Sequence, residues 1–320
     1  MLFQLIEKVY RNAVYSRTDA DGSIFYFSVA DFDGLKQDPF VFMSSKGHKL
    51  QGYFYHYDNY VPGRIIMFEH GMGTGHRAYM KEIERIARQG YLVFTYDHTG
   101  CTESGGESNG GFVHSLIDLN DAINALQKDE KYRDMDISVV GHSWGGFSSL
   151  NIAAFHPEVS HIVAMAGFVS VELILKQFFG GLLSGARKKI YEKEKITYPE
   201  YIESNAVSSL ENTDAKVLII HSKDDKTVSY VNHFEVMQRA LKEKENITFL
   251  TVEGKNHNPN YTKEAVVYKD AFFADYQKMR KKKLLQTEEQ KKTFLAKYDW
   301  HKMTEQDENI WEEIFKALEA

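Results

Sequence analysis

The stretch Ile137-Ser-Val-Val-Gly-His-Ser-Trp-Gly-Gly146 places a serine where it could act as a nucleophile. A β-branched apolar run leads into Gly141-His-Ser-Trp-Gly145, and small residues typical of a helix follow, which is the G-x-S-x-G pattern in a strand–turn–helix setting. A serine that attacks a carbonyl must stand clear of the backbone on a sharp turn, and the flanking glycines let strand and helix approach closely. The helix amides behind Ser143 would also face any negative charge that develops there. A glycine-rich turn gives the same pattern, so the other parts of a hydrolytic site must also be present.

A base and a carboxylate are needed because a serine hydroxyl is a weak nucleophile until its proton is taken. In a parallel sheet such groups collect at the carboxyl ends of the strands. The apolar run that ends at Ile220 leads into the adjacent acids Asp224 and Asp225, and the run 247–252 leads into a loop with His257. Serine, acid and histidine then follow in the order associated with this elbow. His257 is the predicted base, and one of the two aspartates is the predicted acid.

Backbone N–H donors for the oxyanion can be assigned to two positions. One donor is expected from Trp144, directly after the nucleophile. The other is expected from Met72 in the glycine-rich loop Phe68-Glu-His-Gly-Met-Gly73, which follows an early apolar run. The side chain of His70 is expected to pack this loop and to take no part in the chemistry.

The elements that would position these residues alternate between strand and helix from residue 64 onward. Continuous apolar runs, typical of strands buried on both faces of a parallel sheet, cover residues 65–68, 92–95, 137–140, 162–165, 217–220 and 247–252. Helices are predicted over 79–89, 113–126 and 146–155, and alternation over 40–44 and 49–57 predicts a preceding antiparallel hairpin. This order predicts a mainly parallel α/β fold with helices on both faces of the sheet.

Two segments interrupt the alternation. Residues 168–210 are longer than one crossover helix needs, so we predict a small helical cap over the strand ends; the alternative is a long connection with two ordinary helices. Residues 262–320 are predicted to be almost wholly helical, with basic clusters at 280–283 and 291–292 that intervening acids mark as a solvated face. We predict a single domain over 1–320, with an N-terminal extension over 1–37 and a C-terminal helical extension over 284–320.

Composition limits the class of protein. Of the 320 residues, 43% are hydrophobic, which is enough for a sizeable core, and 26% are charged. The net charge of -6 argues against a nucleic-acid-binding surface. A single cysteine, Cys101, allows no disulfide within the chain and fits a reducing compartment. We see neither a secretory signal nor an apolar run long enough for a membrane span, so a cytoplasmic protein is the default expectation.

Four stretches together resemble the α/β-hydrolase family, particularly its serine-aminopeptidase-like and small esterase branch. They are His70-Gly-Met-Gly73, Asp97-His-Thr-Gly100 with Ser104 and Gly106, Gly141-His-Ser-Trp-Gly145, and Asp225-Lys-Thr-Val228 followed by His257. The resemblance covers about residues 40–283 and implies an eight-stranded sheet, a lid after the sixth strand and a Ser-His-Asp mechanism. In the family's usual spacing a valine follows the acid by three residues, which selects Asp225 over Asp224. Thr99 and Cys101 depart from the family's usual Asp-x-Arg-Gly-x-Gly loop, which is usually structural, and we expect Cys101 to be a packed residue.

The prediction for function is a serine hydrolase that works through an acyl-enzyme, foremost a carboxylesterase on small or medium apolar acyl esters. Ser143 would attack, His257 would transfer the proton, and Asp225 would orient His257. The N–H groups of Met72 and Trp144 would bind the oxyanion. This mechanism needs no metal and no organic cofactor. The expected partner is a small-molecule ester or amide.

Two alternatives remain open at this point. A serine aminopeptidase would need a carboxylate in the cap for the substrate's ammonium group. Four cap glutamates are available for that role: Glu192, Glu194, Glu200 and Glu203. Phe178 and Phe179 in the same segment suggest instead an apolar acyl or aromatic group, although they could simply pack the cap onto the sheet. A catalytically silent binding module is the alternative outside enzymes, but no member of the predicted triad is missing.

Overall fold

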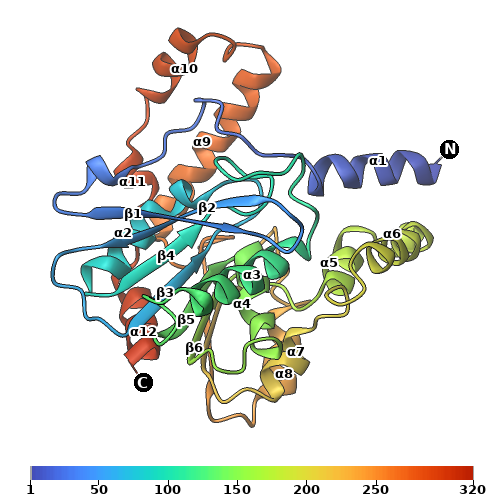
Figure 1. Ribbon diagram of the computed structural model, residues 1–320. Helices are drawn as coiled ribbons and strands as arrows, with labels where there is room; N and C mark the ends of the chain where they lie inside the picture. The colour runs from blue at the N-terminus through green and yellow to red at the C-terminus, as the bar shows by residue number, and fades with distance from the viewer. Residues whose placement is uncertain (1, 320) are drawn as a thin grey trace.

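The computed structural model describes residues 2–319, which fold around an eight-stranded sheet (Figure 1). The strand order is β1-β2-β4-β3-β5-β6-β7-β8. β1 (Lys36–Met43) and β2 (Lys49–His56) form an antiparallel hairpin, β2 also pairs antiparallel with β4, and every later pair is parallel. The remaining strands are β3 (Arg64–Glu69), β4 (Leu92–Tyr96), β5 (Asp136–His142), β6 (His161–Met165), β7 (Lys216–Ser222) and β8 (Ile247–Val252). The predicted α/β fold, the hairpin and all six predicted buried strands are present.

Helices bury apolar side chains on both faces of this sheet. α2 (Met80–Arg88) and α12 (Glu308–Glu319) cover one face, with α12 against β6 and β7. The other face is covered by α3 (His114–Lys128), α4 (Trp144–Asn151), α7 (Ala206–Glu211) and α8 (Phe234–Leu241). The buried side chains of α12 form one helical stripe, Ile310, Trp311, Ile314 and Leu318, inside the same core as the strands. The end of the chain is therefore part of the sheet's core.

The segment 168–210 is helical, as predicted, and contacts the N-terminal helix. It forms α5 (Val171–Phe178), the short turn η4 (Gly181–Leu183) and α6 (Ser184–Thr197) before α7 begins. α1 (Leu2–Val14) is joined to α6 because the hydroxyl groups of Tyr10 and Tyr15 donate to the buried carboxylate of Glu194, at 3.0 and 2.6 Å. Burial raises the pKa of Glu194, while the two tyrosine hydrogen bonds favour its charged form.

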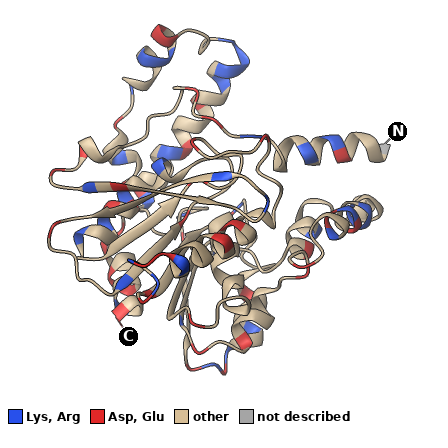
Figure 2. Ribbon diagram, in the orientation of Figure 1, with Lys and Arg blue, Asp and Glu red and all other residues tan. Residues whose placement is uncertain are grey.

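The segment after β8 adds α9 (Lys263–Lys281), α10 (Glu288–Leu295) and α11 (Trp300–Met303). The ring of Phe272 in α9 packs tilted against Phe294 and edge-on against Trp300, within a small apolar cluster separate from the sheet's core. The basic residues 280–283 are exposed, as predicted for a solvated face, and Figure 2 marks the basic positions along the ribbons of α6 and α9. None of the helices within residues 2–319 has the length and apolar character needed to cross a membrane.

Candidate active site

Ser143 lies on a strained turn between β5 and α4. Its backbone φ of 57° and ψ of -110° belong to a region that side-chain-bearing residues rarely adopt. A Cβ at Gly141 would lie 2.3 Å from the carbonyl oxygen of Gly145, and a Cβ at Gly145 would lie 2.1 Å from the carbonyl oxygen of Glu69. Both contacts are too short for any other residue. The two glycines therefore permit the close strand–helix approach that holds Ser143 in this conformation.

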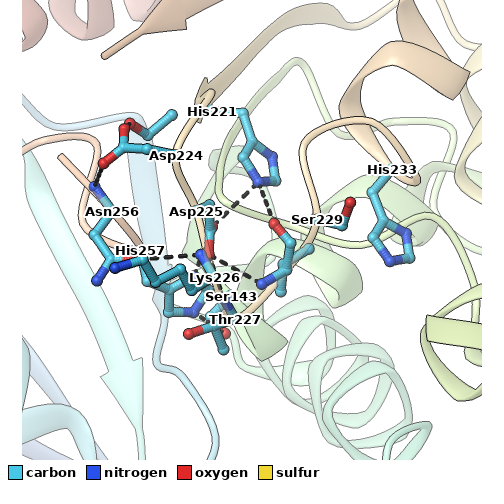
Figure 3. Close-up of polar contacts among 12 residues, drawn as sticks. Ser143, His221, Asp224, Asp225, Lys226, Thr227, Ser229, His233, Asn256 and His257 are labelled. Carbon is cyan, nitrogen blue, oxygen red and sulfur yellow. Dashed lines mark hydrogen bonds and ion pairs between the residues drawn. The ribbon is translucent and has the colours of Figure 1, made fainter. Parts of the chain in front are cut away.

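Ser143, His257 and Asp225 form a continuous line of hydrogen bonds (Figure 3). His257 Nε2 lies 2.8 Å from Ser143 Oγ, and His257 Nδ1 lies 2.8 Å from Asp225 Oδ2. The serine follows β5, the aspartate follows β7 and the histidine follows β8, so all three come from the carboxyl ends of parallel strands. These distances are those of a nucleophile, its base and a group that orients the base.

Asp225 is held as an ionised carboxylate. Its Oδ1 accepts the N–H groups of Thr227 and Val228 at 2.8 and 3.0 Å, and His221 Nε2 lies 3.2 Å from Oδ2. Burial on its own raises the pKa of Asp225, but the hydrogen bonds from His221 and His257 outweigh burial and keep that pKa well below its usual range. The carboxylate therefore presents a fixed negative charge to His257.

Asp224 has a different set of partners. Its Oδ1 accepts the Ser222 hydroxyl at 2.6 Å and the Gly254 N–H at 2.8 Å, and its Oδ2 accepts the Asn256 N–H at 3.2 Å. These bonds fix the loop that carries His257 but do not reach the imidazole ring. Figure 3 shows the two adjacent side chains pointing to different partners. The choice of Asp225 over Asp224, made on the resemblance, agrees with this geometry.

A chain of hydrogen bonds that the sequence did not reveal connects the loop after β3 with the His257 loop. The Gly71 N–H donates to the Tyr79 hydroxyl at 3.1 Å, and that hydroxyl lies 2.8 Å from His142 Nδ1. His142 Nε2 in turn donates to the carbonyl oxygen of His257 at 2.6 Å. Burial, followed by the nearby His257, lowers the pKa of His142 to about 3, so its ring is neutral and Nδ1 accepts the Tyr79 proton.

Replacing Tyr79 by phenylalanine should lower kcat by about three- to tenfold, because a lost hydrogen bond to a buried neutral group costs about 0.5–1.5 kcal/mol. KM should change little, since the hydroxyl acts here by holding Gly71 and His142. The measurement is steady-state kinetics on one ester. Tyr57→Phe is the matched control, because the Tyr57 hydroxyl donates to Glu84 at 2.8 Å away from the site. Equal effects of the two variants would show that Tyr79 only stabilises the fold.

The predicted oxyanion donors lie beside the nucleophile. Met72 and Trp144 both line the cavity at Ser143, and neither N–H donates a hydrogen bond to any residue within 2–319. The loop is fixed by His70, which is buried, donates from Nδ1 to the Gly71 carbonyl oxygen at 2.8 Å, and accepts the His98 N–H at 3.0 Å. Burial lowers the pKa of His70 to about 3, so this ring also stays neutral. His70 packs the loop as expected.

Cys101 and the loop around it are structural. Cys101 is fully buried, and burial raises the pKa of its thiol, so it is not a second nucleophile. Thr99, which departs from the usual family loop, is bonded through its N–H and hydroxyl to Asp118 at 2.7 and 2.9 Å. No group of three His, Cys, Asp or Glu side chains in the described part of the chain is arranged to hold a metal ion.

A cavity of about 840 Å³ opens at Ser143 and is lined mostly by apolar side chains. Phe178 and Phe179, the predicted substrate contacts, are both part of its wall. Both ends of the chain also contribute, which the sequence did not indicate. These contributions are Val9, Tyr10, Ala13 and Val14 of α1, residues 24–26, and Trp300, Met303 and Thr304 at α11. Residues distant in sequence from the triad thus build much of the space in which a substrate would bind.

Comparison with known proteins agrees with this geometry. Residues 61–209 match the family described as serine aminopeptidase, S33. A stretch of 99 residues is 34% identical to the monoglyceride lipase of Rattus norvegicus, but this match covers only 30% of this chain and 32% of the lipase. The uncharacterized protein YqkD of Bacillus subtilis is 22% identical over 84% of this chain and 87% of its own length.

Among solved structures, the esterase Pf2001 of Pyrococcus furiosus superposes with a TM-score of 0.59 at 16% identity, covering 83% of this chain and 98% of the esterase. At this identity the likeness concerns the fold alone. The eight-stranded topology, the strained turn at Ser143 after β5 and the family match over the central segment agree with one another. The chain has the α/β-hydrolase fold, and its central segment resembles the serine aminopeptidase family.

Proposed function

We propose that this protein is a serine carboxylesterase that acts on esters of small or medium apolar acids through an acyl-enzyme. The observation that carries the proposal is the hydrogen-bonded line from Asp225 through His257 to Ser143, whose serine end opens into a largely apolar cavity. The lipase and esterase likenesses are consistent with it, although they extend to only part of this chain or to its fold.

In the proposed mechanism, Ser143 Oγ attacks the ester carbonyl carbon while His257 Nε2 takes the hydroxyl proton. Asp225 keeps Nδ1 protonated and stabilises the imidazolium that forms. The N–H groups of Met72 and Trp144 stabilise the negative oxygen of the tetrahedral intermediate. The intermediate collapses as His257 gives its proton to the departing alcohol. Water, activated by the same histidine, then releases the acid and restores Ser143, so the cycle uses no metal and no organic cofactor.

The cavity lining favours an ester over a peptide with a free N-terminus. None of the four cap glutamates considered above is part of the lining, and Glu194 is bonded to the tyrosines of α1. Within residues 2–319 the only carboxylate that lines the cavity is Asp270, which is exposed and accepts the Asn256 side-chain N–H at 3.3 Å. Such a rim carboxylate is a weak anchor for an ammonium group. Phe178, Phe179 and Phe168 offer instead a surface for an apolar acyl chain.

A panel of p-nitrophenyl esters with two to twelve acyl carbons, measured beside aminoacyl-p-nitroanilides, tests this proposal. We expect kcat/KM to be highest for one of the short or medium esters, because each extra methylene that fits an apolar pocket adds about 1–3 kcal/mol of discrimination. The anilides should turn over at least a hundredfold more slowly. Higher kcat/KM on the anilides would establish the peptidase, and no turnover of any compound would favour a silent binding module.

A further inference from the structure

Lys269 of α9 lines the same cavity as Ser143, but no carboxylate within residues 2–319 is in contact with its ammonium group. Its Nζ lies 4.8 Å from the centre of the Tyr261 ring, and the carboxylates that act on it, Glu82 and Asp270, do so at a distance and not through hydrogen bonds. No residue within 2–319 forms an ion pair with this ammonium group. Lys255, in the loop before α9, contrasts with it because it pairs directly with Asp307.

The two nearby carboxylates already have other partners. Glu82 is buried and accepts the Asn260 side-chain N–H at 3.0 Å, and Asp270 is exposed and bonded to Asn256. Burial lowers the pKa of Lys269, while Glu82 and Asp270 raise it. An ammonium group that is partly removed from water without a contacting counter-ion is costly. An anion bound beside Lys269 would remove that cost.

The cavity has two chemically different walls. The wall formed by α1, α5 and the segment near the elbow is apolar and aromatic, with members such as Val14, Phe112, Phe168 and Ile174. The wall formed by residues 24–26, α9 and α11 also carries aromatic rings, but it adds the positive charge of Lys269 and, at the exposed Asp270, a carboxylate that is already bonded to Asn256. A substrate that matches both walls has an apolar part and a negatively charged part.

We propose that Lys269 binds a carboxylate carried by the substrate, so that the preferred substrates are monoanionic esters. This inference rests on the proposed function and narrows its substrate class. One ammonium group offsets a single negative charge, and the nearby carboxylates Glu82 and Asp270 repel a phosphate dianion more strongly than they repel a carboxylate. The lysine ammonium group acts as a point charge. It therefore does not fix the orientation of the carboxylate, as the two parallel N–H donors of an arginine would.

The kinetic test uses pairs of esters that differ by one carboxylate. Mono-p-nitrophenyl glutarate is compared with p-nitrophenyl valerate to place the charge on the acyl half, and 4-carboxyphenyl valerate is compared with phenyl valerate to place it on the leaving half. For each pair, kcat/KM of the charged ester is divided by kcat/KM of the neutral ester. In Lys269→Met this ratio should fall about ten- to a hundredfold for one of the two pairs, as expected when a hydrogen bond to a charged group is lost. Lys269→Arg should restore part of the ratio.

Lys278→Met is the matched control, because Lys278 is exposed on the same helix and does not line the cavity. It should leave both ratios as in the wild type. If Lys269→Met changes the ratios no more than Lys278→Met does, the inference is wrong, and the lysine serves only to cover the ring of Tyr261.

A binding measurement separates this inference from the proposed function. The Ser143→Ala protein, which cannot form an acyl-enzyme, is titrated calorimetrically with monomethyl glutarate and then compared with the Ser143→Ala/Lys269→Met protein. We expect at least tenfold weaker binding to the double variant. If binding depends on Lys269 but the wild type turns over no ester, the proposed esterase activity is wrong and the anion site stands. Ester turnover with equal binding to both variants would overturn the anion site alone.

Discussion

Replacing Ser143 by alanine should abolish ester hydrolysis, with kcat falling by up to about a millionfold, the loss seen when a serine nucleophile is removed from a triad. The reason is that His257 Nε2 lies 2.8 Å from Ser143 Oγ, and within the described part of the chain it bonds no other hydroxyl. A phosphonofluoridate probe should add one adduct to the wild type, and mass spectrometry of the tryptic peptides should locate it on Ser143.

Ser45→Ala provides the comparison, since Ser45 is an exposed residue of the β1–β2 turn outside the cavity lining. It should react with the probe at the wild-type rate. An adduct that persists in Ser143→Ala would show that another residue is the nucleophile, and the elbow would then be a structural turn.

Asp225→Asn should lower kcat by about ten-thousandfold, because an amide cannot hold His257 in the tautomer whose Nε2 accepts the serine proton. Asp225 Oδ2 lies 2.8 Å from His257 Nδ1, and the charge of this carboxylate also stabilises the imidazolium. KM should stay within a few-fold of the wild type, since Asp225 does not line the cavity. Single-turnover kinetics on one p-nitrophenyl ester measures the effect on acylation directly.

Asp224→Asn is the matched control at the neighbouring position. Its effect on kcat should be at least a hundredfold smaller, because the amide oxygen can still accept part of the hydrogen bonds from Ser222, Gly254 and Asn256. The main effect of Asp224→Asn should be a lower melting temperature of the protein and not a lower kcat. A larger loss of kcat in Asp224→Asn than in Asp225→Asn would transfer the orienting role to Asp224.

The parts that the sequence predicted are those encoded by short local patterns. The β-branched run before Gly141 and the small residues after Ser143 specify a strand and a helix, and the steric demands at 141 and 145 leave glycine as the only choice. The places of His257 and Asp225 followed from the rule that polar groups collect where parallel strands end. The choice between the two aspartates needed the family spacing, because both follow the same strand.

The parts that could not be predicted depend on which side chains meet in three dimensions. Tyr79 precedes α2, yet it touches His142 at the end of β5, and no periodicity in either segment indicates that contact. Lys269 is one of four lysines on α9, and only the packing of that helix beside the cavity distinguishes it from Lys278. The position of α1 at the cavity wall likewise depends on the hydrogen bonds of Tyr10 and Tyr15 to Glu194. Tyr10 and Glu194 are 184 positions apart in the sequence.

The contribution of α1 and α11 to the cavity affects when the site becomes functional during synthesis. Trp300 and Met303 are made after Ser143, Asp225 and His257, and so is α12, whose buried side chains complete the core of the sheet. The triad and this wall of the cavity therefore become complete together, when the chain is nearly finished. Damage to α1 has a different effect: a protease that removes α1 would alter which esters are accepted, while the hydrogen bonds of the triad, none of which involves α1, stay in place.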